Sequence, residues 1–136
     1  MTDVVVDASV WVSRLVKGDV HHARCREWLD NQAASGGLLV APVLVLAELA
    51  GAISRRTNRP SLAHQAVRGL QALPQLRLVS VDPALADLAA ALAADHALRG
   101  ADAVYVATAS QLGLPLVTLD DEQLERAKSL VTTSSP

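Results

Sequence analysis

The chain opens with Val4-Val5-Val6-Asp7-Ala8-Ser9, in which a short β-branched run ends at an acidic residue. Valine favours strands because its branched side chain packs well on a pleated surface. An apolar run without polar alternation is typical of a strand in a parallel sheet that is covered on both faces. Asp7 therefore stands at the predicted carboxyl end of a core strand.

Three further acidic residues adjoin apolar segments of the chain. Glu48 interrupts residues 43–47, Asp102 precedes residues 103–107, and Asp120 follows residues 116–119. An isolated buried charge is normally paired, neutralised or bound to a metal, because leaving water is costly. The sequence offers these four carboxylates no obvious cationic partner. A divalent metal site is therefore the leading hypothesis.

Composition limits the classes of protein to which the chain can belong. It has 136 residues, of which 51% are hydrophobic and 19% charged, and this fits one compact domain with a substantial core. We expect a single domain over residues 1–131 and a frayed tail over residues 132–136. The formal net charge of −2 argues against a protein that coats nucleic acid. Without the four acidic residues the balance would be +2, so a metal-loaded site could accept a polyanion.

The apolar content does not predict a membrane protein. The longest candidate run, residues 38–47, is about half of the ~20 residues that a spanning helix needs, and it contains Pro42. The N-terminus does not have the pattern of a secretory signal. A single Cys25 cannot form an internal disulfide. These features predict a cytoplasmic protein.

Short β-branched runs alternate with longer helical patterns along the chain. This alternation is typical of βαβ units and predicts the α/β class with a mainly parallel sheet. Strands are predicted at residues 4–7, 38–41, 78–81 and 116–119, and helices at residues 9–17, 21–34, 42–56, 61–73, 82–98, 102–112 and 120–130.

This assignment places Asp7 and Asp120 beyond the carboxyl ends of two strands and Asp102 at a helix N-terminus. In open α/β sheets, ligands bind in the crevice outside the carboxyl ends of the strands. Each of the three aspartates also has an ordinary interpretation as a helix cap or a first-turn acid. Both interpretations stay open at the level of sequence.

Glu48 is harder to explain as a structural residue. It lies within a predicted helix that is apolar all round, and such a helix is normally buried. The residues four positions away are Leu44 and Ala52, so neither can form an ion pair with it. The alternative is that its head reaches water while its stem packs. As metal ligands, four carboxylates would favour Mg²⁺ or Mn²⁺ over Zn²⁺.

The order of these motifs resembles that of the PIN-domain ribonucleases, specifically the VapC-type toxins. The resemblance rests on Asp7-Ala8-Ser9, Leu46-Ala47-Glu48-Leu49, Arg99-Gly100-Ala101-Asp102 with the apolar residues after it, and Thr118-Leu119-Asp120. It implies a PIN-like three-layer α/β/α sandwich. It also implies a Mg²⁺ centre, with Mn²⁺ possible, formed by Asp7, Glu48, Asp102 and Asp120. Asp121 could share or replace the role of Asp120, while Ser9 and Thr118 resemble hydroxyls that orient the ligands.

The same resemblance implies an activity and partners. The activity is endonucleolytic hydrolysis of RNA by the toxin of a type II toxin–antitoxin pair, leaving 5′-phosphate and 3′-hydroxyl ends. Arg14 and Arg99 are candidates for contacts with the substrate phosphates. The implied protein partners are a VapB-type antitoxin and a second copy of the chain.

Two other functions remain possible on the sequence. One is a PIN-like module that has lost catalysis and binds RNA or protein. The other is a receiver-like signalling domain, which also gathers acidic residues at the carboxyl edge of a parallel sheet. That domain would need an acidic pair near the first strand and a lysine after a late strand. The chain has only Lys17 and Lys128, so this alternative is the weaker one.

Overall fold

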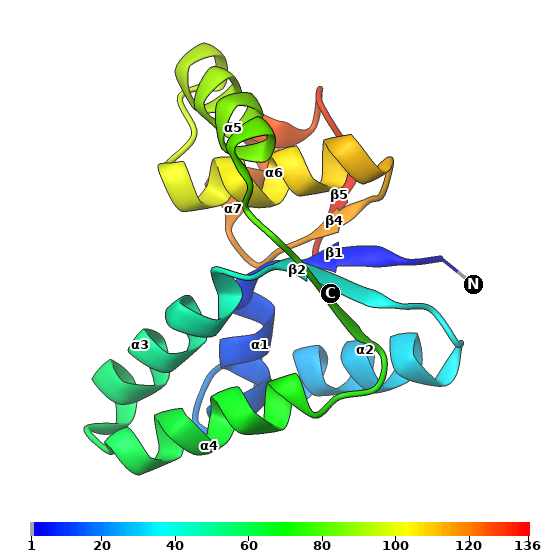
Figure 1. Cartoon of the computed structure of the whole chain (residues 1–136). Coiled ribbons are helices and arrows are strands. Elements are labelled where there is room, and N and C mark those ends of the chain that lie inside the picture. The colour runs from blue at the N-terminus through cyan, green and yellow to red at the C-terminus, as the bar shows by residue number, and fades with distance from the viewer. Residues whose placement is uncertain (1) are drawn as a thin grey trace.

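A parallel sheet divides the molecule into two helical layers (Figure 1). The computed structural model describes residues 2–136, which form five strands in the order β3-β2-β1-β4-β5, all parallel. The strands are β1 (Val4–Val6), β2 (Leu39–Pro42), β3 (Leu76–Val79), β4 (Leu116–Val117) and β5 (Thr133–Ser134). The helices are α1 (Ala8–Leu15), α2 (His22–Ala34), α3 (Val45–Thr57), α4 (Pro60–Gln71), α5 (Pro83–His96), α6 (Gly100–Leu112) and α7 (Asp121–Ala127).

The first four helices cover one face of the sheet and the last three cover the other (Figure 1). On the first face α3 and α4 pack as a pair, while on the second α6 lies against β1 and β2. This arrangement confirms the predicted three-layer α/β/α sandwich.

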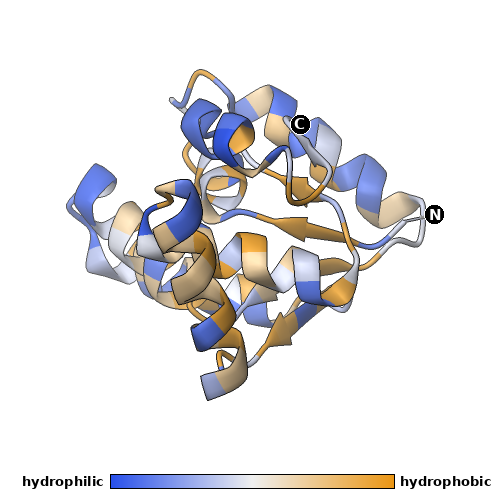
Figure 2. Cartoon of the chain, turned by 90° about the horizontal axis from the view of Figure 1, so that it is seen from above, coloured by the Kyte–Doolittle hydropathy of each residue, from blue (hydrophilic) through white to orange (hydrophobic). Residues whose placement is uncertain are grey.

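β1 lies at the centre of the sheet, where the sequence predicts the most buried strand. It pairs with β2 through Val5 and Val40 and with β4 through Val5 and Leu116. All three valines of β1 are buried. The strands consist mainly of hydrophobic residues, while hydrophilic residues gather on the outer helices (Figure 2). This is expected when both faces of a parallel sheet are covered.

Three aspartates begin helices by capping them. The side chains of Asp7, Asp82 and Asp120 accept backbone N–H groups at the starts of α1, α5 and α7. Such caps satisfy amide groups that have no partner within the helix. The cap interpretation is therefore correct for Asp7 and Asp120, and whether they also have another role depends on where their carboxylates lie.

The structure differs from the sequence prediction at several element boundaries and at the C-terminus. Pro42 ends β2, opposite Val79, instead of starting the helix. Its missing N–H is tolerated because the pairing of β2 with β1 ends at Val40, while on the other side the Val43 N–H donates to the Val79 carbonyl. The third strand begins two residues earlier than predicted, at Leu76. The segment expected to fray contains β5, since the N–H groups of Leu116 and Thr118 donate to the carbonyls of Thr132 and Ser134, at 2.8 and 3.1 Å. These polar residues have no core pattern because β5 is a short edge strand, whose pairing needs only backbone groups.

The strand order also bears on the receiver-like alternative. Receiver-like domains have the order 2-1-3-4-5, whereas this sheet has the order 3-2-1-4-5. The topology therefore contradicts that alternative. Separately, none of the helices within residues 2–136 combines the length and hydrophobicity needed to cross a bilayer.

Candidate active site

The strand order creates a crevice between β1 and β4. The chain leaves β1 into α1 on one face of the sheet and leaves β4 toward α7 on the other (Figure 1). Because the two connections diverge, the carboxyl ends of these neighbouring strands stay open, and ligands bind at such a position in α/β proteins. Asp7 and Asp120 stand at the two sides of this opening.

All four predicted acidic residues line one cleft of about 630 Å³ at this edge. Each lies at the start of a different helix: Asp7 caps α1, Glu48 and Asp102 lie in the first turns of α3 and α6, and Asp120 caps α7. The N-terminus of a helix favours negative charge because its N–H groups point outward. Four helix starts therefore converge on one strongly acidic cleft.

Two hydroxyl groups hold the aspartates of the two strands together. Asp7 is buried, with 6% of its surface exposed, and its Oδ2 accepts from the Thr118 hydroxyl at 3.1 Å and from the Ser9 N–H at 3.2 Å. The Thr118 hydroxyl oxygen accepts in turn from the Asp120 N–H at 3.1 Å. The Ser9 hydroxyl accepts from the Leu119 N–H, also at 3.1 Å. Both hydroxyls thus fix the end of β4 against the end of β1.

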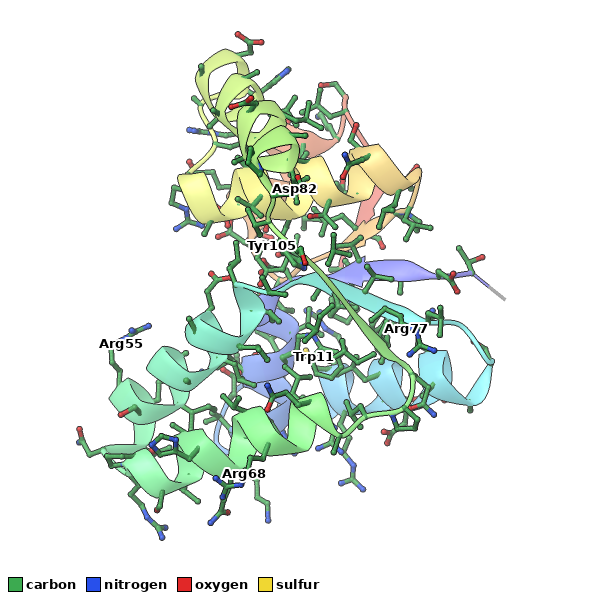
Figure 3. All side chains as sticks on the ribbon, in the orientation of Figure 1. Trp11, Arg55, Arg68, Arg77, Asp82 and Tyr105 are labelled. Atoms are coloured by element: carbon green, nitrogen blue, oxygen red, sulfur yellow. The ribbon has the colours of Figure 1, made fainter. Side chains whose placement is uncertain are left out.

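Tyr105 holds Glu48 in the cleft. It points from α6 toward the start of α3 (Figure 3), and its hydroxyl donates to Glu48 Oε1 at 2.7 Å. Burial raises the pKa of Glu48, and the charges of Asp7 and Asp102 add to this, while the bond from Tyr105 opposes it. Burial and the neighbouring Glu48 also raise the pKa of Tyr105 far above its ordinary value. The phenol therefore stays protonated and remains a donor.

Arg99 joins the other two carboxylates. Its Nε donates to Asp102 Oδ2 at 2.7 Å, and the same guanidinium forms an ion pair with Asp120 Oδ2. Burial raises the pKa of Asp102 in spite of this contact, since only 15% of its side chain is exposed. Asp120 is 27% exposed, and although burial opposes it, hydrogen bonds from the Gln123 N–H and Arg99 lower its pKa. The expectation that the acidic residues have no cationic partner is therefore wrong for this pair. Arg99 is that partner, through a local contact with Asp102 three residues along the chain and a contact with Asp120 that spans 21 residues.

The sequence profile of the PIN domain matches residues 4–129. The chain belongs to the PIN domain family. Its fold is similar to those of *Mycobacterium tuberculosis* VapC20, described as a sarcin–ricin loop cleaving toxin, and of VapBC2 from *Rickettsia felis*, solved with a DNA fragment from the promoter. The TM-scores are 0.77 and 0.76 at 20% and 14% identity, and the matches cover 90% and 98% of this chain and 94% and 98% of those chains.

A third similar structure is the DNA-bound VapBC of *Salmonella typhimurium*. It has a TM-score of 0.74 at 18% identity, covering 99% of this chain and 98% of that one. No curated protein has significant sequence similarity to the chain. The predicted PIN-family membership is thus confirmed by the profile match, and these structures establish the shared fold.

The PIN fold brings most of the predicted site residues together. Ser9 and Arg99 line the cleft with the four acidic residues, and Thr118 is buried next to Asp7. Arg14 lies elsewhere, in a separate pocket between α1, α2 and α4. Its side chain leaves α1 on a face that does not border the cleft, so the structure does not place it among the site residues. Asp121 is exposed and does not line the cleft, so Asp120 is the fourth acidic residue.

Two residues of this PIN domain support the site although they were not predicted as site residues, Tyr105 and Gln123. Tyr105 lies one helical turn after Asp102, on the same side of α6, and this spacing could have indicated a role. Gln123 is buried; its N–H donates to Asp120 Oδ1 at 3.0 Å and its side-chain amide to the Asp102 carbonyl at 3.3 Å. Gln123 thereby ties α7 to the start of α6. Nothing in the local sequence indicates that link.

Arginines form the basic side of the cleft. Arg55 and Arg56, at the end of α3, line it together with Asp19. Arg56 forms an ion pair with Asp19 at 2.8 Å, which attaches the loop after α1 to α3. The cleft is therefore lined by basic as well as acidic side chains.

The chemistry of the four carboxylates fits Mg²⁺ or Mn²⁺, because hard cations prefer oxygen ligands. Their present spacing does not yet form an ion cage: within residues 2–136, no three acidic, histidine or cysteine side chains converge closely enough to hold one ion. The ion pairs of Arg99 connect Asp102 and Asp120 across the intervening space. The donor set fits a divalent cation, but loading would require side chains to move.

Proposed function

We propose that the chain is a metal-dependent endoribonuclease and the toxin of a type II toxin–antitoxin pair. It would hydrolyse RNA phosphodiester bonds and leave 5′-phosphate and 3′-hydroxyl ends. One observation carries the proposal: four carboxylates from four separate helix starts line a single cleft, at the open edge of a PIN-family sheet. A purely structural role for these residues would not require them to meet.

The four acidic residues would hold the cation, and the groups around them would keep them in place. Asp7, Glu48, Asp102 and Asp120 are the proposed ligands of Mg²⁺ or Mn²⁺. When bound, the cation would supply activation of a water molecule and neutralisation of charge on the phosphate oxygens. Thr118 and Ser9 orient Asp7, while Tyr105 orients Glu48. Groups of this kind are typically needed for full metal affinity or activity.

The substrate is proposed to be RNA, held through its backbone. Arg55 and Arg56 line the cleft and carry the charge needed to contact phosphates. The chain has only three aromatic residues, Trp11, Trp28 and Tyr105, and Tyr105 is buried. Extensive stacking of bases is therefore not part of the proposal.

The proposed partners are a VapB-type antitoxin and a second copy of the chain. The *R. felis* and *S. typhimurium* structures, which share the fold over nearly the whole chain, are VapBC assemblies. The antitoxin should be encoded in the adjacent reading frame. Co-expression of that product with the tagged chain should recover a complex in which cleavage is suppressed, and light scattering of the free chain should give the mass of a dimer.

The experiment that tests the proposal is cleavage of total cellular RNA by purified protein, with Mg²⁺, Mn²⁺ or EDTA, followed by mapping of the product ends. The sarcin–ricin loop belongs among the substrates because the *M. tuberculosis* relative is described as cleaving it. Metal-dependent cuts with 5′-phosphate ends are expected. Cyclic phosphate ends would contradict the proposed hydrolysis, and binding of RNA without cleavage under any metal condition would favour the catalytically inactive PIN-like module.

Asp82 provides a matched control for Asp7. Both residues cap helices through their side chains, but Asp82 lies at the start of α5 (Figure 3) and does not line the cleft. Asn is also a good cap, so Asp7→Asn and Asp82→Asn should both fold. Only Asp7→Asn should abolish cleavage. Equal cleavage activity of the two variants would mean that Asp7 acts only as a helix cap.

A further inference from the structure

Arg99 bridges two acidic residues that belong to different helices. It precedes α6, and its guanidinium reaches Asp102 in the first turn of that helix and Asp120 at the start of α7. Its side chain is 64% exposed, so the contact is not enforced by burial. Instead, the guanidinium lies at the solvent side of the cleft that all four acidic residues line.

The bridge engages the oxygens that a cation would use. Arg99 takes Oδ2 of both aspartates, while Asp120 Oδ1 already accepts the Gln123 N–H at 3.0 Å. Each oxygen of Asp120 therefore already accepts one hydrogen bond. A guanidinium and a divalent cation would also repel each other strongly at such short range. The guanidinium of Arg99 and a divalent cation therefore cannot bind Asp102 and Asp120 at the same time at short range.

We propose that Arg99 is a displaceable internal counter-ion of the acidic site. In the metal-free protein it neutralises the Asp102–Asp120 pair, and a divalent cation loads by displacing its guanidinium. This inference rests on the metal dependence proposed above. The observation behind it is that one guanidinium pairs with two of the four proposed ligands.

Two properties of the bridge suit a displaceable group. Arg99, the cationic half of the bridge, is exposed to solvent, which screens its ion pairs and lets a competing cation reach them. Arg99 does not lose its charge by deprotonation. The hydrogen bonds and charges of Asp102 and Asp120 raise the pKa of Arg99 further above its ordinary value. The guanidinium stays charged at any working pH. Competition with another cation is then what moves it.

The first test compares Mn²⁺ binding, measured by electron paramagnetic resonance of the free ion and by calorimetry, in wild type and Arg99→Gln. Removing the competing charge should tighten Mn²⁺ binding by about tenfold. Arg99→Lys, which keeps the charge but loses the planar fork, should lie between the two. The readout is ion affinity, so it does not depend on cleavage.

Two other arginines serve as matched controls. Arg55 lines the same cleft from α3 and forms no ion pair within residues 2–136, while Arg68 extends outward from α4 (Figure 3). Arg55→Gln and Arg68→Gln should change Mn²⁺ affinity by less than about threefold, because solvent and salt screen these charges. A gain in Arg55→Gln as large as that in Arg99→Gln would show a general charge effect and overturn the proposal.

The outcomes separate this inference from the proposed function. If wild type binds Mn²⁺ and Arg99→Gln binds it no more tightly, the counter-ion role is overturned and the metal dependence stands. If neither protein binds Mn²⁺, both ideas fail together.

A second measurement uses the unmodified protein and does not depend on the folding of any variant. The Nε–H resonance of Arg99, protected by its bond to Asp102, is followed by NMR during titration with Mg²⁺. It should shift or exchange faster with the same midpoint as ion binding. A resonance that stays in place when the site is saturated with Mg²⁺ would overturn the displacement.

Discussion

The Tyr105 hydroxyl donates a hydrogen bond to Glu48 Oε1 at 2.7 Å, joining α6 to α3 across a separation of 57 residues. Tyr105 is fully buried, so this contact is what satisfies its polar group. Glu48 gains a fixed orientation toward the other acidic residues. Glu48 therefore lines the cleft, and its carboxylate does not extend away from it into solvent.

Tyr105→Phe should separate this contact from simple packing, because phenylalanine keeps the ring. We expect the free energy of unfolding to fall by about 1–2 kcal/mol, since a partly buried carboxylate loses its donor. RNA cleavage should fall about tenfold or more because Glu48 loses its orientation. Urea unfolding and cleavage assays measure the two effects. A double-mutant cycle with Glu48→Gln is the control, and additive effects would argue against coupling between the two residues.

Thr118→Val should loosen the connection between β1 and β4. Valine keeps the shape of threonine but removes the hydroxyl that donates to Asp7 and accepts from the Asp120 N–H. A loss of about 1–3 kcal/mol in the free energy of unfolding is expected, because a buried carboxylate and an amide lose their partner together. Thr118→Ser retains the hydroxyl and should recover most of the stability and activity. Equal behaviour of the valine and serine variants would show that only side-chain volume matters.

Asp120 and Asp121 are adjacent, but the structure assigns them different positions. Asp120 lines the cleft and bonds to Arg99, while Asp121 is exposed. Asp120→Asn keeps the cap acceptor of α7, yet cleavage should fall by at least about a hundredfold, the upper end of the loss seen when a partner of a metal ligand is removed. Asp121→Asn should leave cleavage nearly unchanged. Comparable losses in the two variants, measured on the same RNA, would mean that they share the role.

The ion pair between Asp19 and Arg56 should make a pH-dependent contribution to stability. Burial raises the pKa of Asp19, but hydrogen bonds from the His21 N–H and Arg56 outweigh it and hold that pKa below the ordinary value of 3.8. The unfolded chain therefore binds the proton first as pH falls. The stabilisation is complete above the unfolded value and is lost as pH falls through the folded value.

Asp19→Asn removes this charge while keeping an acceptor for the His21 N–H. At neutral pH the variant should be less stable by about 0.5–1 kcal/mol, a modest effect because Arg56 is substantially exposed. The difference from wild type should vanish at low pH. Urea unfolding of both proteins across the acid range measures it, and a difference that widens toward low pH would reverse the predicted sign.

Much of the fold was predictable because it follows from local patterns. The valines of β1, the apolar residues of β2 and the Ala-rich run after Asp102 predict buried strands and a buried helix whatever their neighbours are. The polar residues of β5 give no such signal, since an edge strand forms through backbone pairing with β4. Its assignment as a frayed tail therefore failed for a physical reason.

The candidate site was only partly predictable. The four acidic residues stood out because each interrupts or borders an apolar run. Of the groups that hold them, Ser9 and Thr118 were predicted, whereas Arg99 was predicted to contact substrate phosphates and Gln123 looks like any polar residue of a short helix. The contacts of Gln123 with Asp102 and of Arg99 with Asp120 cross between helices, so no local spacing reports them, although Arg99 and Asp102 are only three residues apart.

The sequence by itself determined the α/β class, the positions of the acidic residues at the ends of core segments, and their order along the chain, because hydrophobic burial and helix capping act over a few neighbouring residues. Only the tertiary structure decided which groups meet. Thr118 reaches Asp7 across 111 residues because β4 pairs with β1. The same packing allows Arg99 to bridge Asp102 and Asp120 and directs Arg14 away from the cleft. Such contacts depend on strand order and on the faces that the helices cover, and these emerge only when the whole sheet is assembled.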